Sequence, residues 1–486
     1  MQKKFVANLA FLILMNLFIK SIYILGFETQ VQNQVGAASY GIYFAIFNFS
    51  FLLSILLDFG ITNFNNKNIA QNNHLLSKHF TGLFTLKILL AIIYIIVVVL
   101  SGLLVGYDSR LMKLLLLQGF NMFLLFFINY LRSNLAALHL FKTDAVVSIL
   151  DRLTLIILCI IMLKAGVLKE PNGIMYFVYA QTIGYSISAI TAFIIIIKKT
   201  ESFKIKWNWV FSIMILKKSF PFAILTLLMS FYNRIDTVMI ERMLPEGIGD
   251  VQSGIYAQAF RLLDATNMIA FLTAGMLLPI FSRMLKHKEN IEPLVKLIST
   301  LLLTPAIVVG VGCFFYSKEL MGILYTFHVE ESAKIFSLLM LSFIAVSTTY
   351  IFGTLLTANG NMKQLNIMAA FGMILNIVLN ILLIRYYERE GKPAFGSAVS
   401  SLITQYLTAI FQVIIAQRIF KFRINHRLLN TLILFAIGVV VINYGSKLLH
   451  YSWQVNFAMM VVSCGLWAFL SGIISIKSIF RIFKYG

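Results

Sequence analysis

Long apolar runs separated by short polar breaks occupy almost the whole of the 486-residue chain. A helix needs about 20 apolar residues to cross a bilayer core, so each run of that length is a candidate transmembrane span. The pattern predicts fourteen spans, which begin near Val6, Tyr40, Thr81, Lys113, Ala145, Ile174, Ser219, Gly254, Pro293, Ala333, Gln364, Phe395, Leu428 and Asn456. Since no soluble domain fits in the gaps, we expect an all-α polytopic membrane protein.

The basic residues predict an orientation. Lysine and arginine concentrate in the amino-terminal segment, in alternate loops and in the carboxyl-terminal tail. Because loops rich in these residues stay in the cytoplasm, both termini are expected there. The first apolar run is too long for a signal peptide and no small-residue cleavage site follows it, so we interpret it as the first span.

Composition agrees with a membrane protein, since 59% of the residues are hydrophobic and 12% are charged. An average soluble domain has roughly 25% charged residues. The formal net charge of +21 would suggest nucleic acid in a soluble protein, but here topology accounts for it and no nucleic-acid partner is expected. Cys159, Cys313 and Cys464 lie in separate apolar runs without metal-ligand spacing, so no metal site is expected.

Short matches indicate that the chain contains a repeat. The segments that end at Lys20 and Arg234 align with each other, and Gly41-Ile42-Tyr43 recurs as Gly254-Ile255-Tyr256. We predict six-helix bundles at residues 1–200 and 219–420, a cytoplasmic linker at 201–218, and a terminal helix pair with a basic tail at 421–486. Two such bundles would form a V-shaped central cavity, because substrate sites of repeat-built transporters lie between the repeats.

Charged side chains inside the predicted spans are the first candidates for function. A charge at membrane depth costs about 2.5 to 3.5 kcal/mol on insertion scales, so such groups normally face a bundle interior or a watery cavity. The candidate cations are Lys20, Arg152, Arg234 and Arg261, and the candidate carboxylates are Asp58, Asp236 and Asp264.

Helical spacing places polar neighbours beside these charges. Asn16 lies one turn before Lys20, Ser230 lies one turn before Arg234, and Asn233 is adjacent to Arg234. On the eighth span Arg261 and Asp264 are three residues apart and can pair, and Gln258 extends the same stripe.

Asp236 is two residues from Arg234, roughly 200° around the helix, so Asp236 needs another partner.

The alternative is that these charges are structural, since interhelical pairs fix packing and terminal lysines reach the interface. For Lys87 and Asp58, which each lie near the cytoplasmic end of a span, the structural interpretation is favoured. For Arg152 beside Asp151, and for Arg261 with Asp264, both interpretations stay open. For Lys20 and Arg234, which are matched between the halves, a position lining the cavity is favoured.

No catalytic motif is found in the sequence. There is no P-loop, no HExxH, no G-x-S-x-G and no pair of cysteines. The loops leave little room for a nucleotide-binding or catalytic unit. We therefore expect a transporter rather than an enzyme, without a cofactor, driven by gradients, by the membrane potential or by the substrate.

The chain resembles the polysaccharide transporter branch of the multidrug, oligosaccharidyl-lipid and polysaccharide exporter superfamily. The order and spacing of several segments carry the resemblance: LDFGITNFNNKNIAQN from Leu57, RIDTVMI and GIYAQAFRLLD between Arg234 and Asp264, MLLPIFSRM ending at Met284, and LTANGNMKQLNIMAAFGMILNIVLNILLI followed by GSAVSSL. In the last pair, Asn376 and Asn380 share a helix face and Gly396-Ser397-Ala398 predicts a close helix contact. The loop RYYEREGKPAFGS is longer than the family's usual turn.

The resemblance implies a flippase of the bacterial cytoplasmic (inner) membrane that works by alternating access. Its cargo would be an undecaprenyl-diphosphate-linked repeat unit of O-antigen lipopolysaccharide or capsule. The four cations would bind the diphosphate, for which arginine is best suited. Asn16, Ser230, Asn233 and Gln258 would contact sugars, and Asp236, Asp264 and Asp58 would couple H+ or Na+ or be structural. Membrane lipids and glycan polymerase or glycosyltransferase machinery are the expected partners.

Three other functions are alternatives. A lipid II flippase would have the same architecture and basic cavity. A cation-coupled multidrug exporter would favour carboxylates in the cavity, whereas the central candidates here are basic. A glycan polymerase or ligase would need large periplasmic loops, and the loops of this chain are short.

Overall fold

The computed structural model describes residues 15–16, 18–62, 65, 75–138, 140–169, 171–200, 208–421 and 426–473. This part of the chain consists of helices and contains no strand, which confirms the predicted all-α fold class. Eleven of its helices are long and apolar enough to cross a membrane, or twelve if one bent pair is a single span. A multi-pass membrane protein is therefore confirmed.

The count of fourteen spans stays a prediction. Most of the predicted first span, which begins near Val6, lies outside the described residues. The bent pair joins residues 18–35 to α3 (Ala37–Leu53), with 119° between the two segments. The bend occurs at Gly36, whose φ of 84° lies in the left-handed region that glycine adopts without strain.

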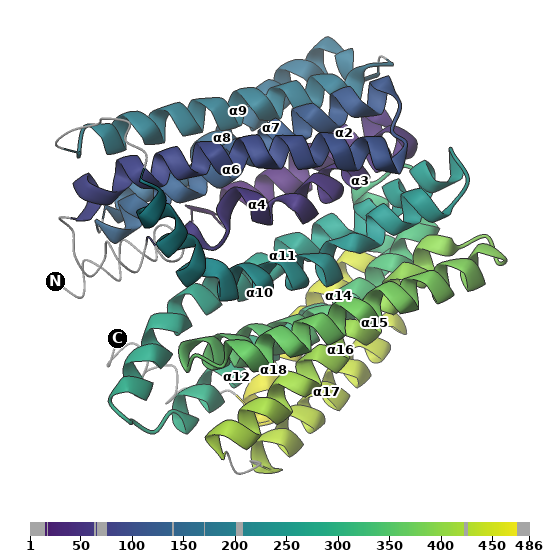
Figure 1. Cartoon of the computed structure of the whole chain (residues 1–486). Helices are drawn as coiled ribbons and strands as arrows, with labels where there is room; N and C mark the ends of the chain where they lie inside the picture. The colour runs from purple at the N-terminus through teal and green to yellow at the C-terminus, as the bar shows by residue number, and fades with distance from the viewer. Residues whose placement is uncertain are drawn as a thin grey trace. The chain divides into compact units, whose positions relative to one another are not determined.

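Contacts divide the chain into two compact units, residues 1–254 (unit 1) and residues 255–486 (unit 2). Unit 1 contains η1 (Tyr23–Glu28), α2 (Thr29–Val35), α3, α4 (Ile55–Asp58), α6 (Leu75–Val105), α7 (Ser109–Ala137), α8 (Phe141–Ala165), η2 (Val167–Lys169), α9 (Gly173–Ile197) and α10 (Trp209–Met243). The boundary falls within α11 (Ile248–Lys286). In this unit α6, α7, α8 and α9 run lengthwise beside one another (Figure 1).

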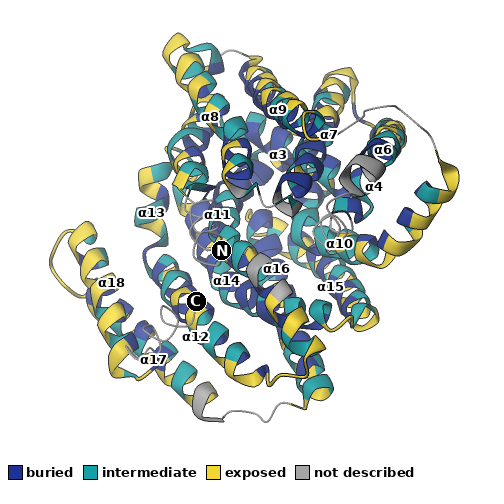
Figure 2. Ribbon diagram, turned by 90° about the vertical axis from the view of Figure 1, so that its left-hand side faces the viewer, coloured by how far each residue is buried: buried dark blue, intermediate teal, exposed yellow. Residues whose placement is uncertain are grey.

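Helix α3 is the central helix of unit 1. It packs against α7 and α10, and it buries the large side chains of Tyr40, Tyr43 and Phe44. Figure 2 accordingly shows α3 mainly in the colour of buried residues. A second apolar cluster joins α6, α7 and α9 to the start of α10 through residues such as Phe80, Tyr130 and Ile215. Helix α10, which begins at Trp209 within the predicted linker, thus packs in unit 1, and the predicted domain boundaries stay a prediction.

Unit 2 is built around α14. It contains α12 (Glu292–Phe315), α13 (Ser317–Leu324), α14 (Val329–Ala358), α15 (Met362–Glu388), α16 (Pro393–Phe420), α17 (His426–Lys447) and α18 (Trp453–Leu470). In the 18-residue apolar segment by which α14 qualifies as a candidate span, 61% of the residues are buried. Helix α14 packs against both α12 and α16. Large apolar side chains of α17 and α18 are exposed, as expected of surfaces that face lipid (Figure 2).

The close contact predicted for Gly396-Ser397-Ala398 is confirmed. A Cβ atom on Gly396 would lie 2.4 Å from the carbonyl oxygen of Leu383 in α15, so only glycine fits. The Ser397 hydroxyl donates a hydrogen bond to Asn380 Oδ1, and the Asn380 amide donates to the carbonyl of Asn376 at 2.9 Å. Small residues and side-chain amides hold α15 and α16 together, as is usual in membranes.

The terminal helix pair packs on α12. The contact consists of buried residues that include Ile307, Val311, Phe435 and Met460. At one end the Tyr316 hydroxyl hydrogen-bonds with Ser446 Oγ at 2.7 Å. These contacts make α17 and α18 part of unit 2.

Candidate functional site

The candidate site in unit 1 is centred on Arg152 in the middle of α8. The carbon Cζ of its guanidinium lies 5.0 Å from the ring centroid of Tyr23 and 5.7 Å from that of Tyr185. The guanidinium also donates a hydrogen bond of 3.5 Å to the Tyr185 hydroxyl. Its Nε atom is 3.5 Å from Asp151 Oδ2. Two aromatic faces and a neighbouring carboxylate thus hold the charge in place.

Lys20 and Asn16 approach the same face of α8. The Asn16 amide donates a hydrogen bond of 2.7 Å to Ser148 Oγ, and Ser148 lies one turn before Arg152. The charges that act on the half-buried Lys20 come from Arg152, Asp151, Arg132 and Asp144. Three predicted site residues, Lys20, Asn16 and Arg152, are therefore brought together in one unit.

Glu28 belongs to this cluster and was not among the predicted site residues. Only 2% of Glu28 is exposed, and it accepts a hydrogen bond of 2.7 Å from the Tyr40 hydroxyl. It ends the π-helical turn η1, a geometry frequent at functional sites. One signal was present in the sequence: Glu28 is the sole acidic residue before Asp58.

Several buried polar atoms of unit 1 have no hydrogen-bond partner in the described structure. Gln32, one turn further along, is buried, and neither atom of its amide has a hydrogen-bond partner. The Tyr23 hydroxyl and Asp151 Oδ1 are also buried without a hydrogen bond. Buried polar groups are normally hydrogen-bonded to protein or water, so these atoms can form hydrogen bonds with water or with polar groups of a ligand.

Arg234 lies on the face of α10 that meets α3. Its Cζ atom is 5.2 Å from the ring centroid of Phe51. One turn away, Thr237 Oγ1 accepts a hydrogen bond of 3.4 Å from the Asn48 amide. The neighbouring candidates Ser230 and Asn233 are half-buried, whereas Asp236 is buried.

A second arginine sits just beyond this face, at the end of α10. Arg242 stacks on Tyr107, with 4.0 Å between Cζ and the ring centroid. Burial, and to a lesser extent the carboxylate of Glu241, raise the pKa of the Tyr107 phenol to about 12. The phenol therefore stays neutral at physiological pH and presents an intact aromatic face to the guanidinium.

The remaining basic candidate, Arg261, lies in unit 2. Its Nη1 atom is 3.9 Å from Asp264 Oδ2, so the two residues face each other as their spacing predicts. The Gln258 side-chain amide donates to the backbone carbonyl of Phe327 at 3.5 Å, and the backbone carbonyl of Gln258 accepts a hydrogen bond of 3.2 Å from the Tyr325 hydroxyl. Gln258 therefore ties α11 to the segment before α14.

Asp58 pairs with Lys87. Lys87 Nζ lies 2.7 Å from Asp58 Oδ1 and donates a further bond of 3.2 Å to the carbonyl of Leu57. The Thr62 hydroxyl also donates to Asp58, and the ammonium lies 5.3 Å from the ring centroid of Tyr130. This carboxylate ties α4 to α6, and the Lys87 ammonium in turn lies against α7.

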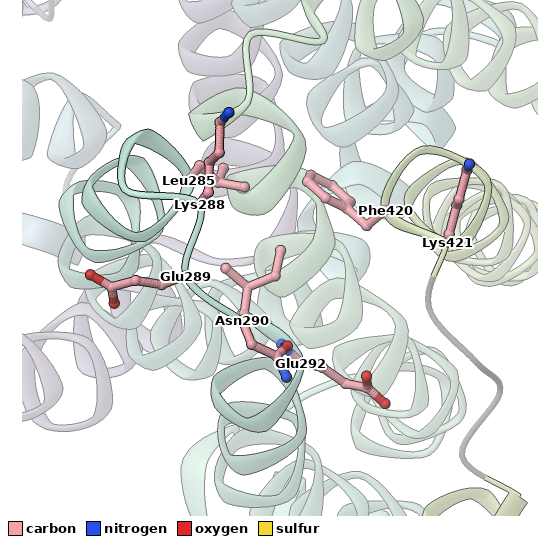
Figure 3. Close-up of a pocket in the computed structure, with 8 residues that line it drawn as sticks. Leu285, Lys288, Glu289, Asn290, Glu292, Phe420 and Lys421 are labelled. Atoms are coloured by element: carbon pink, nitrogen blue, oxygen red, sulfur yellow. The ribbon is translucent and has the colours of Figure 1, made fainter.

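A surface pocket of about 260 Å³ occurs in unit 2, and none of the predicted site residues lines it. The loop from Leu285 to Glu292 forms one side of the pocket, and Phe420 with Lys421 forms the other (Figure 3). It mixes basic and acidic side chains. Among the described residues, no group of three or more histidine, cysteine or acidic side chains is placed to hold a metal ion.

Comparison with protein families gives one match, to the family described as "Polysaccharide biosynthesis protein", over residues 5–285. The chain belongs to this family. The predicted resemblance to the polysaccharide transporter branch is confirmed. No curated protein matches the chain significantly.

Solved structures show the same fold at low sequence identity. The "Lipid II flippase MurJ, inward closed conformation" matches with a TM-score of 0.66 and 16% identity, over 96% of this chain and 97% of the other. A multidrug resistance MATE family transporter of the MOP superfamily in an inward-facing conformation matches with a TM-score of 0.62 and 12% identity, over 83% and 94%. A MOP superfamily transporter from Pyrococcus furiosus matches with a TM-score of 0.61 and 12% identity, over 86% of this chain and 95% of the other.

Proposed function

We propose that this member of the polysaccharide biosynthesis family is a flippase for lipid-linked oligosaccharides. Its cargo is an undecaprenyl-diphosphate-linked repeat unit of O-antigen or capsule, moved from the inner to the outer leaflet of the bacterial cytoplasmic membrane. Both termini lie in the cytoplasm, and transport follows alternating access. The observation that carries the proposal is that Arg152, in the middle of the candidate span α8, and the half-buried Lys20 lie near enough for their charges to act on each other.

The chemistry of a diphosphate supports these residues as its binding groups. A guanidinium offers forked donors that match two phosphate oxygens, and it stays protonated inside a protein. Arg152 is already oriented by Tyr23 and Tyr185, so little rotamer entropy is lost on binding. Arg234 and Arg261 are further cations, while Asn16, Ser230, Asn233 and Gln258 are the proposed sugar contacts.

The membrane potential is a sufficient driving force for this transport. A head group with about two negative charges gains roughly 4 to 5 kcal/mol per 100 mV when it crosses an inside-negative membrane outward. Coupling to H+ or Na+ through Asp236 or Asp264 remains an alternative proposal. Asp58 is the poorest candidate for coupling, because Lys87 and Thr62 already engage it. Neither enzyme chemistry nor a cofactor is required, and membrane lipids with glycan polymerase or glycosyltransferase machinery are the proposed partners.

A second candidate function is transport of lipid II. It is favoured by the 0.66 TM-score over 96% of the chain against the lipid II flippase structure. Both cargoes share the undecaprenyl diphosphate, so the same cations would serve either. A cation-coupled multidrug exporter is less well supported, because its cationic substrates would meet Arg152, Lys20 and Arg234.

The test is a translocation assay in proteoliposomes that contain a lipid-linked repeat unit. Wild type is compared at equal expression with Arg234→Ala and Arg234→Lys, and Arg110→Ala is the control because Arg110 is an exposed residue of α7. We expect loss of transport in Arg234→Ala and partial recovery in Arg234→Lys. Normal transport by Arg234→Ala would remove this residue from the site. Preference for lipid II over every repeat unit offered would favour the second candidate function.

A further inference from the structure

The two glycines of the repeated Gly-Ile-Tyr motif meet where α3 passes the first turns of α11. A Cβ atom on Gly41 would lie 1.8 Å from the carbonyl oxygen of Asp250 and 2.6 Å from the backbone nitrogen of Gly254. A Cβ atom on Gly254 would lie 2.0 Å from the carbonyl oxygen of Ala37. The two backbones touch, and there is no space for a methyl group on either glycine.

The contact is reciprocal. Each glycine packs on a residue one turn before the other glycine, Gly41 on Asp250 and Gly254 on Ala37. The same surface of two repeat-related helices is thus used on both sides, as in a contact across a two-fold axis. Repetition in the sequence and close approach in space are independent observations that select the same two residues.

The crossing is one end of a longer seam between α3 and the α10–α11 hairpin. Further along α3, Asn48 meets Thr237 and Phe51 meets Arg234, so α3 and α10 run antiparallel. Beyond the turn at Ser54 the seam continues with Phe59 stacked on Phe220 at 6.1 Å between centroids. Side chains make those contacts, whereas the glycine crossing is made by backbone alone.

We propose that the Gly41–Gly254 crossing is the outer gate of the transporter, closed here and separated each time the carrier opens outward. This inference rests on the proposed function and on the predicted orientation, which puts the beginnings of α3 and α11 on the outer side. A backbone contact cannot be opened by turning a side chain, so the helices must move apart as rigid bodies. The contact excludes a head group, yet it depends on van der Waals and Cα–H···O contacts that are individually weak and readily broken.

The gate can be tested without any substrate by labelling a cysteine beside it. Ser253 is fully buried next to Gly254, and its hydroxyl donates to the carbonyl of Gly249 at 2.7 Å, so Ser253→Cys is a conservative reporter. The reporter is introduced into a chain in which alanine replaces Cys159, Cys313 and Cys464. Spheroplasts that contain this protein are then treated with a membrane-impermeant maleimide. We expect slow labelling when the glycines are intact, and labelling about tenfold faster with Gly41→Ala or Gly254→Ala, because the closed state loses population.

A matched control is Gly173→Ala, where a Cβ atom would lie 2.1 Å from the carbonyl oxygen of Leu168 within the α8–α9 connection. It creates the same kind of clash in the same unit and should leave the labelling rate unchanged. The double variant Gly41→Ala with Gly254→Ala should label about as fast as the faster single variant, because both changes disrupt one contact. Rates that multiply would show two unrelated local defects and would overturn the proposal.

Thermal unfolding in detergent shows whether the glycine variants fold. If they do not, the reporter is labelled in the chain with both glycines intact, at rest and while it transports an undecaprenyl-diphosphate-linked disaccharide. Labelling that does not accelerate during measured transport overturns the gate, as do folded single variants with unchanged labelling. Faster labelling of the variants, with no lipid-linked saccharide moved by wild type, would instead retain the gate and reject the proposed function.

Discussion

At the scale of single residues, the charges inside this membrane protein divide by what surrounds them. Lys87 and Asp58 are paired at 2.7 Å and serve packing. Arg152 lies between aromatic rings, and its Nε atom is 3.5 Å from Asp151 Oδ2, a longer contact than that between Lys87 and Asp58. The proposed function has the other donors of this guanidinium bind a phosphate. A buried cation can therefore be structural or functional, according to whether it is already closely paired with a carboxylate.

The first prediction concerns Arg152. Arg152→Ala should lower transport of the lipid-linked repeat unit at least tenfold, since a hydrogen bond to a charged group contributes about 1.5 to 3 kcal/mol. Arg152→Lys should retain part of the activity, because it keeps the positive charge but loses the two parallel N–H donors of the guanidinium. Tyr185→Phe keeps the ring that faces the guanidinium and removes the hydroxyl that accepts the 3.5 Å hydrogen bond, so it is the control. Initial rates in proteoliposomes measure the effect, and equal rates for Ala and wild type would contradict it.

The second prediction concerns the pair of Lys87 and Asp58. Asp58→Asn leaves a lysine that is 3% exposed without its counter-ion, and breaking such a buried pair costs about 3 to 5 kcal/mol. Asp58→Asn combined with Lys87→Met should recover most of this loss. Thermal unfolding in detergent measures both. Lys318→Ala breaks an ion pair whose side chains are 69% and 72% exposed, and no resolvable change is expected there.

At the scale of secondary-structure elements, close packing depends on glycines at particular positions. Because Gly396 has no side chain, α15 and α16 can approach each other closely. Gly438 in α17 likewise leaves space for the indole of Trp467 from α18. That indole donates a hydrogen bond of 3.2 Å to the carbonyl of Phe435. In membranes, where apolar burial gives little driving force between helices, such contacts decide which helices associate.

The third prediction tests the terminal helix pair. A Cβ atom on Gly438 would lie 2.0 Å from Trp467 Nε1, so Gly438→Ala should displace the indole and lower the unfolding temperature. Gly445→Ala in the same helix meets nothing within 4 Å, and there the better helix propensity of alanine should give up to about 1 kcal/mol of stabilisation. Opposite signs for the two variants are expected. Equal effects would show that the indole contact contributes nothing.

At the scale of the whole molecule, transport should depend on the membrane potential. Potassium gradients with valinomycin impose potentials of either sign on proteoliposomes. An inside-negative potential should accelerate outward movement of the diphosphate-linked substrate and a reversed potential should slow it, because about two charges cross the field. A rate that ignores the potential but follows a pH or sodium gradient would favour coupling through Asp236 or Asp264.

Much of this protein could be predicted from its sequence because the bilayer imposes simple rules. Apolar runs must become helices, since backbone groups cannot stay unpaired in lipid. Helical spacing correctly placed Arg261 opposite Asp264 and the small residues around Ser397 in a helix contact. The family resemblance followed from the order of motifs along the chain and is confirmed by the family match.

What only the tertiary structure decided is which distant residues meet. Glu28 gave a weak signal in the sequence because its hydrogen-bond partner Tyr40 lies beyond the turn at Gly36. Arg152 is oriented by Tyr23 and Tyr185, which belong to other helices. The repeated Gly-Ile-Tyr was visible as a motif, yet its role required the backbone of α3 to be seen touching that of α11. Hydrophobic pattern determines what a segment becomes and which solvent surrounds it, whereas side-chain fit between helices determines how the segments pair.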